Sequence, residues 1–208
     1  MTAVEDRPLR ADAARNAERI LRAARDAYAE LGPDAPMDVI ARRAGVGERT
    51  LYRRFPTKGE LARAVIDQSI GETLSPMIER ATRARNPLRG LTDLIEAAIA
   101  LGAREHNVLA AALKAGTLTD VSVQLDAALE DLMRRAQQAG LVRADLVPDD
   151  LPRMVAMLNG VLSTMDPASD GWRRYVLLMI DAMSTPAPRR LPRAVAIDYQ
   201  PRPGDWPR

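Results

Sequence analysis

Residues 38–55 read DVIARRAGVGERTLYRRF. The apolar positions predict two short helices packed across a tight turn: Ile40 lies on the inner face of the first helix, and Leu51 and Phe55, four residues apart, form that of the second. Gly45 stands where the chain must leave the first helix sharply, and such an exit requires the positive φ that glycine tolerates. This stretch therefore predicts a helix-turn-helix.

The outer surface of the predicted helix pair is basic. Between Arg42 and Lys58 the chain has six basic residues and a single acid, Glu48. A solvated basic hairpin in an unrelated bundle would explain scattered arginines, since most charge runs are only solvated surfaces. Here the apolar spacing, the turn glycine and a Tyr-Arg-Arg-Phe run at 52–55 coincide, which favours a helix that enters the major groove of DNA.

At these positions the sequence resembles the TetR family of bacterial transcriptional regulators. The resemblance covers roughly residues 12–66 and implies a three-helix DNA-binding domain. Pro36 stands where the family usually has Ser or Thr, so one expected phosphate contact is missing and Asp34 or Ala35 is left as the helix cap. The family's pattern is matched by Ile40-Ala41, Ala44-Gly45-Val46, Thr50-Leu51-Tyr52, Phe55, Lys58 and Leu61.

The second helix of the pair supplies most of the candidate DNA contacts. Arg49, Arg53 and Arg54 are candidates for bidentate bonds to guanine. Tyr52 resembles the family's phosphate-binding tyrosine, and Glu48 either accepts from a cytosine amine or simply favours a helix N-terminus. The full predicted DNA-binding set is Arg43, Gly47, Glu48, Arg49, Thr50, Tyr52, Arg53, Arg54 and Lys58.

The composition predicts an all-α protein of about nine helices. Of the 208 residues 47% are hydrophobic but only 3% are aromatic, so the core must be aliphatic, which favours helices over sheets. No cysteine and a single histidine leave no catalytic motif, metal site or cofactor to predict. No apolar run of 18 residues is present, and we expect a soluble, cytoplasmic protein with no membrane partner.

Four segments are predicted along the chain. A flexible N-terminal arm covers 1–11, and the DNA-binding domain covers 12–66, with its helix-turn-helix at about 36–55. A capping box at Thr57 and Glu60 starts a long helix into the next domain, which Pro76 is expected to kink or restart. A C-terminal helical bundle at 67–184, for ligand binding and dimerisation, is followed by a Pro-rich flexible tail at 185–208.

The last two predicted helices are apolar around too much of their circumference for an ordinary surface position. A second copy of the chain is the simplest cover, and the resemblance implies the same homodimer. A palindromic operator needs two recognition helices about 34–36 Å apart. The predicted dimer interface is Met154, Leu158, Leu162, Trp172, Tyr175, Val176, Met179 and Met183.

The resemblance also implies a cavity for a small apolar effector, which would release a repressor from double-stranded operator DNA. Methionines suit such a cavity but are also ordinary core residues. The alternatives are a ligand-independent regulator, an activator of the same fold, or a helical-bundle enzyme, which the lack of Cys and of clustered inward acids disfavours. The predicted effector residues are Met77, Leu109, Leu113, Met133, Met157 and Asn159, with Asn107 as a further polar anchor.

Overall fold

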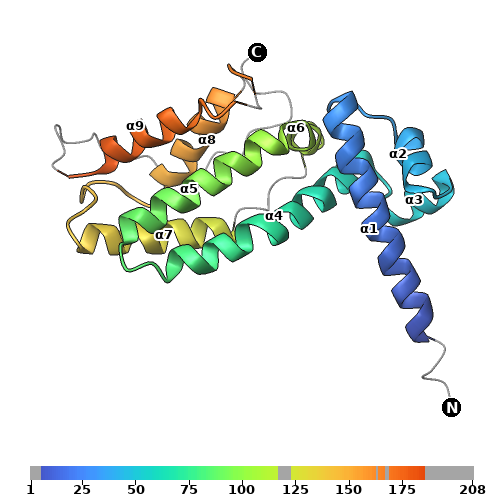
Figure 1. Cartoon of the computed structure of the whole chain (residues 1–208), viewed down its shortest axis with the longest axis horizontal. Helices are drawn as coiled ribbons and strands as arrows, with labels where there is room; N and C mark the ends of the chain where they lie inside the picture. Colours follow the sequence, from blue (N-terminus) through green and yellow to red (C-terminus); the bar gives the residue numbers. More distant parts are fainter. Residues whose placement is uncertain (1–5, 117–122, 163, 167–168, 186–208) are drawn as a thin grey trace. The chain divides into compact units, whose positions relative to one another are not determined.

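The computed structural model describes residues 6–116, 123–162, 164–166 and 169–185 (Figure 1). Within these ranges the chain forms nine helices and no strand, which confirms the all-α prediction. The predicted Pro-rich tail lies outside the described residues beyond 185. The helices are α1 (Asp6–Leu31), α2 (Met37–Ala44), α3 (Glu48–Arg54), α4 (Lys58–Thr82), α5 (Pro87–Arg104), α6 (His106–Lys114), α7 (Val123–Gln138), α8 (Asp150–Leu162) and α9 (Arg173–Met183).

The helices divide into two compact units. The first unit contains α1–α3, the start of α4 as far as Gln68, and α6. The second unit contains the rest of α4 from Ser69, together with α5 and α7–α9. The change of unit at 68–69 lies close to the predicted boundary at 66–67, whereas the membership of α6 in the first unit differs from the predicted arrangement.

In the first unit, α1 packs against α2 and α6, and α2 packs against α3. Helix α1 begins at Asp6, inside the segment 1–11 for which a flexible arm is predicted. The predicted arm is therefore wrong from residue 6 onward. Pro8 falls in the first turn of α1, where a missing backbone N–H interrupts no helical hydrogen bond. On its inner face α1 buries Ile20, Ala24 and Tyr28 almost completely.

The long helix α4 starts at the cap that the sequence predicts. The backbone N–H of Glu60 donates to Oγ1 of Thr57 over 3.1 Å. A restart of the helix at Pro76 is excluded, because α4 continues through the proline to Thr82. Burial of Leu74 and Ala81 on either side of the proline holds the helix together where one backbone hydrogen bond is lost.

The core of the second unit is built around α5, which packs against α7, α8 and α9 (Figure 1). Its side chains Leu91, Leu94, Ile95 and Ile99 are fully buried. Gly90 brings α5 close to the end of α4, because a Cβ at this position would lie 2.7 Å from the carbonyl oxygen of Ala81. Only glycine permits this approach without a shift of the backbone.

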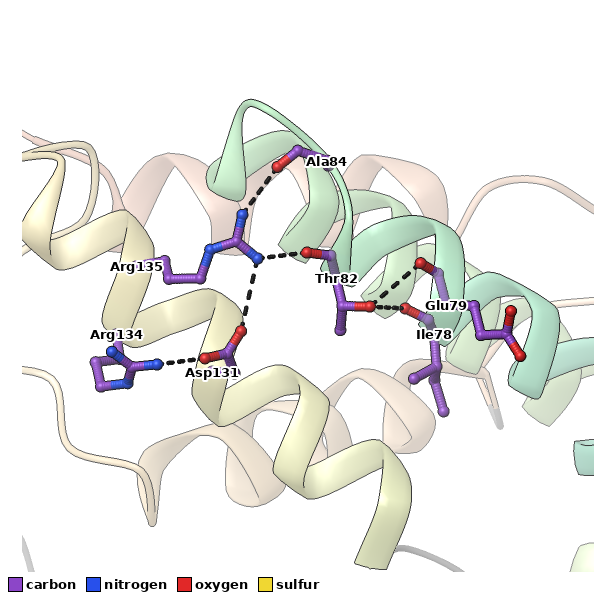
Figure 2. Close-up of polar contacts among 7 residues, drawn as sticks. All are labelled: Ile78, Glu79, Thr82, Ala84, Asp131, Arg134 and Arg135. Carbon is purple, nitrogen blue, oxygen red and sulfur yellow. Dashed lines mark hydrogen bonds and ion pairs between the residues drawn. The ribbon is translucent and has the colours of Figure 1, made fainter.

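An arginine from α7 holds the end of α4 (Figure 2). Arg135 donates from Nη1 to the carbonyl oxygen of Thr82 over 2.6 Å and from Nη2 to that of Ala84 over 2.9 Å. The last carbonyls of a helix have no partner within the helix, and a cation also suits the negative end of the helix dipole. Arg135 therefore fixes the α4–α5 turn. No helix in the described part of the chain is both long and apolar enough to span a bilayer.

Candidate DNA-binding surface

The turn between α2 and α3 has the geometry that the sequence predicts. Gly45 adopts φ 64° and ψ 36°. Two backbone hydrogen bonds close the end of α2: the N–H of Gly45 donates to the carbonyl oxygen of Arg42, and the N–H of Val46 donates to that of Ala41. Pro36 itself is the N-cap residue of α2, so the prediction that Asp34 or Ala35 caps the helix is wrong. An extended φ and ψ suit a cap residue, and proline adopts them readily.

Apolar contacts fix which face of α3 is turned outward. Leu51 has no exposed surface and Phe55 is 8% exposed, so both point into the core of the first unit, in which Ile40 and Ala44 of α2 are also buried. A seven-residue helix with one buried face must present its remaining side chains to solvent.

The outward face of α3 carries most of the predicted DNA-binding set. Tyr52 is 47% exposed, and Gly47, Glu48, Arg49, Arg53 and Arg54 are also exposed, while Thr50 and Lys58 are half-buried. Arg49 and Arg53 are one helical turn apart and share one side of the helix. Among the described residues neither has a carboxylate within ion-pair distance, whereas the guanidinium of Arg54 lies 6.0 Å from the centre of the Phe55 ring.

The arginines of α2 are differently placed, because each has an acidic partner. Arg42 donates to Asp38 over 3.0 Å within the helix. Arg43, a predicted DNA contact, donates to Glu30 of α1 over 2.6 Å, and this hydrogen bond lowers the pKa of the Glu30 carboxyl group. Arg43 also lines a surface groove of about 360 Å³ with Arg19, in which acids accompany the arginines. A phosphate at Arg43 would have to share it with Glu30.

Lys58 stands at the start of α4, next to a small charge cluster. Its side chain is 33% exposed and its Nζ lies 3.9 Å from Oδ1 of Asp34. Partial burial lowers the pKa of the Lys58 ammonium group. Asp34 accepts a shorter hydrogen bond of 2.9 Å from Lys114 of α6, which lowers the pKa of its carboxyl group. Lys58 is therefore partly exposed and only loosely paired.

Helix α6 contributes residues to this unit that sequence reasoning did not identify. Glu105, just before α6, is 2% exposed, and its Oε1 lies 3.5 Å from Nε of Arg25 in α1. Val108 and Ala112 of α6 are also buried. The only sequence signal was an acid at the boundary between two predicted helices, and such a residue is usually exposed.

The predicted effector residues are divided between the two units. Leu109 and Leu113 lie in the first unit, with Leu113 63% exposed, whereas the other four lie in the second unit. Met133 is buried in the core, Met157 is 65% exposed, and Oδ1 of Asn159 lies 2.5 Å from the position that a Cβ on Gly102 would occupy. Met77 is half-buried beside a groove at the end of α4.

Most of the predicted dimer residues face the core of their own chain. Leu158, Leu162, Trp172, Val176 and Met183 are at most 7% exposed, and Met154 and Met179 pack partly against them. Tyr175 alone of the set is clearly exposed, at 42%. The apolar side chains that α8 and α9 turn outward are Met157, Tyr175, Leu177 and Leu178.

Helices α2 and α3 are joined by a turn at Gly45 and have a basic outer face, and a separate helical bundle follows them. This arrangement defines a helix-turn-helix DNA-binding protein. A family model described as bacterial regulatory proteins of the tetR family matches residues 20–65. A second, for the C-terminal domain of SbtR-like transcriptional regulators, matches residues 86–182. The chain belongs to the TetR family of transcriptional regulators.

Solved structures agree with this assignment. A TetR regulatory protein from Mycobacterium vanbaalenii is 32% identical, with a TM-score of 0.56 over 85% of this chain and 99% of that chain. A TetR regulator from Streptomyces coelicolor is 28% identical, with a TM-score of 0.56 over 82% and 99%. FadR from Bacillus subtilis, solved with stearoyl-CoA, is 17% identical with a TM-score of 0.65 over 81% and 97%, which shows the shared fold alone. None of the curated proteins matches the chain significantly.

Proposed function

We propose that this regulator is a homodimeric repressor that reads a palindromic operator with α3 and is released by a small apolar effector. The observation that carries the proposal is the exposed pair Arg49 and Arg53. In the described part of the chain neither arginine has an acidic partner, so either can bind DNA without breaking an ion pair. Guanidinium groups on one side of a recognition helix suit the O6 and N7 acceptors of guanine.

The other members of the surface serve the DNA backbone in this proposal. Tyr52 lies between the two arginines in sequence and Lys58 follows them, and they carry a hydroxyl and an ammonium group that reach solvent. Phosphate contacts of this kind fix the position of the protein but carry no sequence information. Arg43 is a weaker member of the set because Glu30 already holds its guanidinium.

The dimer contact is proposed for the outward faces of α8 and α9. Met157, Leu177 and Leu178 are each more than half exposed, at 65%, 53% and 52%. Helices α8 and α9 pack against each other, and large exposed apolar side chains on neighbouring helices suit a protein interface. The proposed contact therefore uses residues that neighbour those predicted from sequence. Most of the predicted residues are already buried within their own chain.

The course of α4, which begins just after the recognition helix and ends in the second unit, supports the proposed release by an effector. A ligand that binds one arrangement of the two units better than the other shifts the population of DNA-binding dimers. FadR from Bacillus subtilis, a protein of the same fold, was solved with stearoyl-CoA. An apolar effector for this chain is proposed on that basis.

A gel shift with the DNA that flanks the protein's own gene tests the proposal. We expect a preferred sequence, steep salt dependence and one dimer per palindrome. Arg53→Ala should weaken operator binding by roughly 1–3 kcal/mol and leave random DNA almost unaffected, whereas Lys58→Ala should weaken both and reduce the salt slope by about 1. Arg42→Ala, which removes an exposed arginine paired with Asp38, is the matched control.

Two results would contradict the proposal. Equal losses on operator and random DNA for Arg53→Ala would exclude a base-reading role for this residue. No retardation of any DNA at low salt would reopen the alternative of a helical-bundle enzyme. Sedimentation at micromolar concentration tests the dimer separately, since Leu177→Glu should then produce monomers while the DNA-binding surface is unchanged.

A further inference from the structure

A groove of about 340 Å³ lies at the turn between α4 and α5, wholly within the second unit. Its apolar lining comes from Met77, Ala81 and Ala84. A volume of this size is at the lower end of the roughly 300–1,000 Å³ typical of small-molecule sites. The polar residues around it are Arg80, Arg85, Asn86, Arg89 and Asp93.

The groove has an excess of positive charge. Three arginines line it together with one acid, Asp93, whose Oδ2 lies 4.0 Å from Nε of Arg89. Arg80 and Arg85 have no carboxylate within ion-pair distance among the residues that the structure describes. Guanidinium groups present paired N–H donors that fit the two oxygens of a carboxylate.

Three features fix the backbone that forms the groove. Arg135 binds the carbonyl oxygens of Thr82 and Ala84 (Figure 2). Oδ1 of Asn86 accepts a hydrogen bond of 3.1 Å from the N–H of Arg89, so the first turn of α5 is already capped. Gly90 allows α5 to approach Ala81 closely. A surface fixed in advance loses little conformational entropy when a ligand binds.

We propose that this groove binds a small carboxylate with an apolar body. The body lies on Met77, Ala81 and Ala84, and the carboxylate is held by Arg80 and Arg85. A neutral apolar molecule would leave the guanidinium groups without a counter-ion, and an inorganic anion would leave the apolar lining exposed to water. The site is separate from the DNA-binding surface, and it does not depend on the proposed repressor activity.

Isothermal titration of the full chain with octanoate tests this site, with octanamide as the neutral analogue and inorganic phosphate as the anion without a body. We expect saturable octanoate binding with a dissociation constant in the millimolar range or below. Tighter binding is not required, because a groove open to solvent does not enclose its ligand. Octanamide should bind at least about tenfold more weakly, because one charge-assisted hydrogen bond contributes that much. Phosphate should bind more weakly than octanoate as well.

Three variants place the binding in the groove. The double variant Arg80→Ala, Arg85→Ala should lose at least about tenfold in octanoate affinity, and Ala84→Leu should lose affinity by filling the apolar surface. Arg83→Ala is the matched control, since Arg83 is 80% exposed and pairs with Glu79. Each variant is checked for its helical content by circular dichroism, and all but Ala84→Leu alter exposed side chains.

The proposal falls if octanamide or phosphate binds as tightly as octanoate, because the charge or the apolar body would then contribute nothing. An equal loss in Arg83→Ala and the double variant would also overturn it, since any exposed arginine would then suffice. Failure of DNA binding in a gel shift would leave these titrations unaffected, so the two proposals fail independently.

Discussion

Replacing Arg135 with alanine tests whether a side chain of α7 holds the end of α4. In the native protein its guanidinium group bridges the carbonyl oxygens of Thr82 and Ala84 over 2.6 and 2.9 Å, and Nη1 lies 3.5 Å from the carboxylate of Asp131. Alanine keeps the helix propensity of α7 high, so the loss of free energy of unfolding reports the contacts of the guanidinium group.

The magnitude follows from the number and exposure of these bonds. A hydrogen bond from a charged donor contributes roughly 1.5–3 kcal/mol, which gives about 3–6 kcal/mol for the two. The Arg135 side chain is 31% exposed, so water replaces part of this interaction in the variant. We therefore expect the free energy of unfolding to fall by about 2–3 kcal/mol.

Urea unfolding followed by circular dichroism measures this change, at one fixed protein concentration because a dimer would make stability concentration-dependent. Arg134→Ala is the control on the same helix, since Arg134 is 56% exposed and pairs with Asp131. Removing such a surface ion pair should cost less than about 1 kcal/mol. Similar losses in the two variants would refute the role given to Arg135.

Three further perturbations have expected outcomes. Gly90→Ala should lower the free energy of unfolding by roughly 1–3 kcal/mol, because the added Cβ would lie 2.7 Å from the carbonyl oxygen of Ala81; an unchanged urea midpoint would contradict this. Gly45→Ala should cost roughly 1–2 kcal/mol because the native φ is 64°, whereas Gly47→Ala, at φ −69°, should cost less than about 1 kcal/mol, since it loses only the preference of a helix N-cap for glycine over alanine. Burial raises the pKa of Tyr28 to about 12, so its contribution to stability is complete below about pH 10 and is lost as the pH rises toward 12. Absorbance at 295 nm, compared with Tyr28→Phe, should show this late titration, and a phenol that ionises near pH 10 in the folded protein would refute it.

The helix-turn-helix could be predicted from sequence because its determinants are local. Gly45 must adopt a positive φ, Thr57 must cap a helix, and the spacing of Leu51 and Phe55 selects the inner face of α3. Each of these signals depends on residues within one or two turns of one another. The family pattern adds to them, and the structure places all three features where the sequence indicated.

The dimer and effector residues could not be predicted as well, because their surroundings are set by tertiary packing. On α8 and α9 apolar residues occupy most of the circumference, so periodicity does not distinguish the face that contacts α5 from the face that reaches solvent. Val176 and Leu178 illustrate this, since they are two residues apart and are 0% and 52% exposed. The buried position of Glu105 beside Arg25 likewise depends on a contact between segments 80 residues apart.

The assignment of α6 to the first unit affects how this regulator can be divided and recombined. A DNA-binding module cut out as a single N-terminal piece would lack Val108 and Ala112 of α6 and also Glu105, the acid just before α6 that faces Arg25. A chimera that joins this DNA-binding unit to another ligand-binding domain should therefore include α6, so that both chain segments of the first unit are kept together. The boundaries of such chimeras should be chosen from the helices that pack together, and not from sequence order alone.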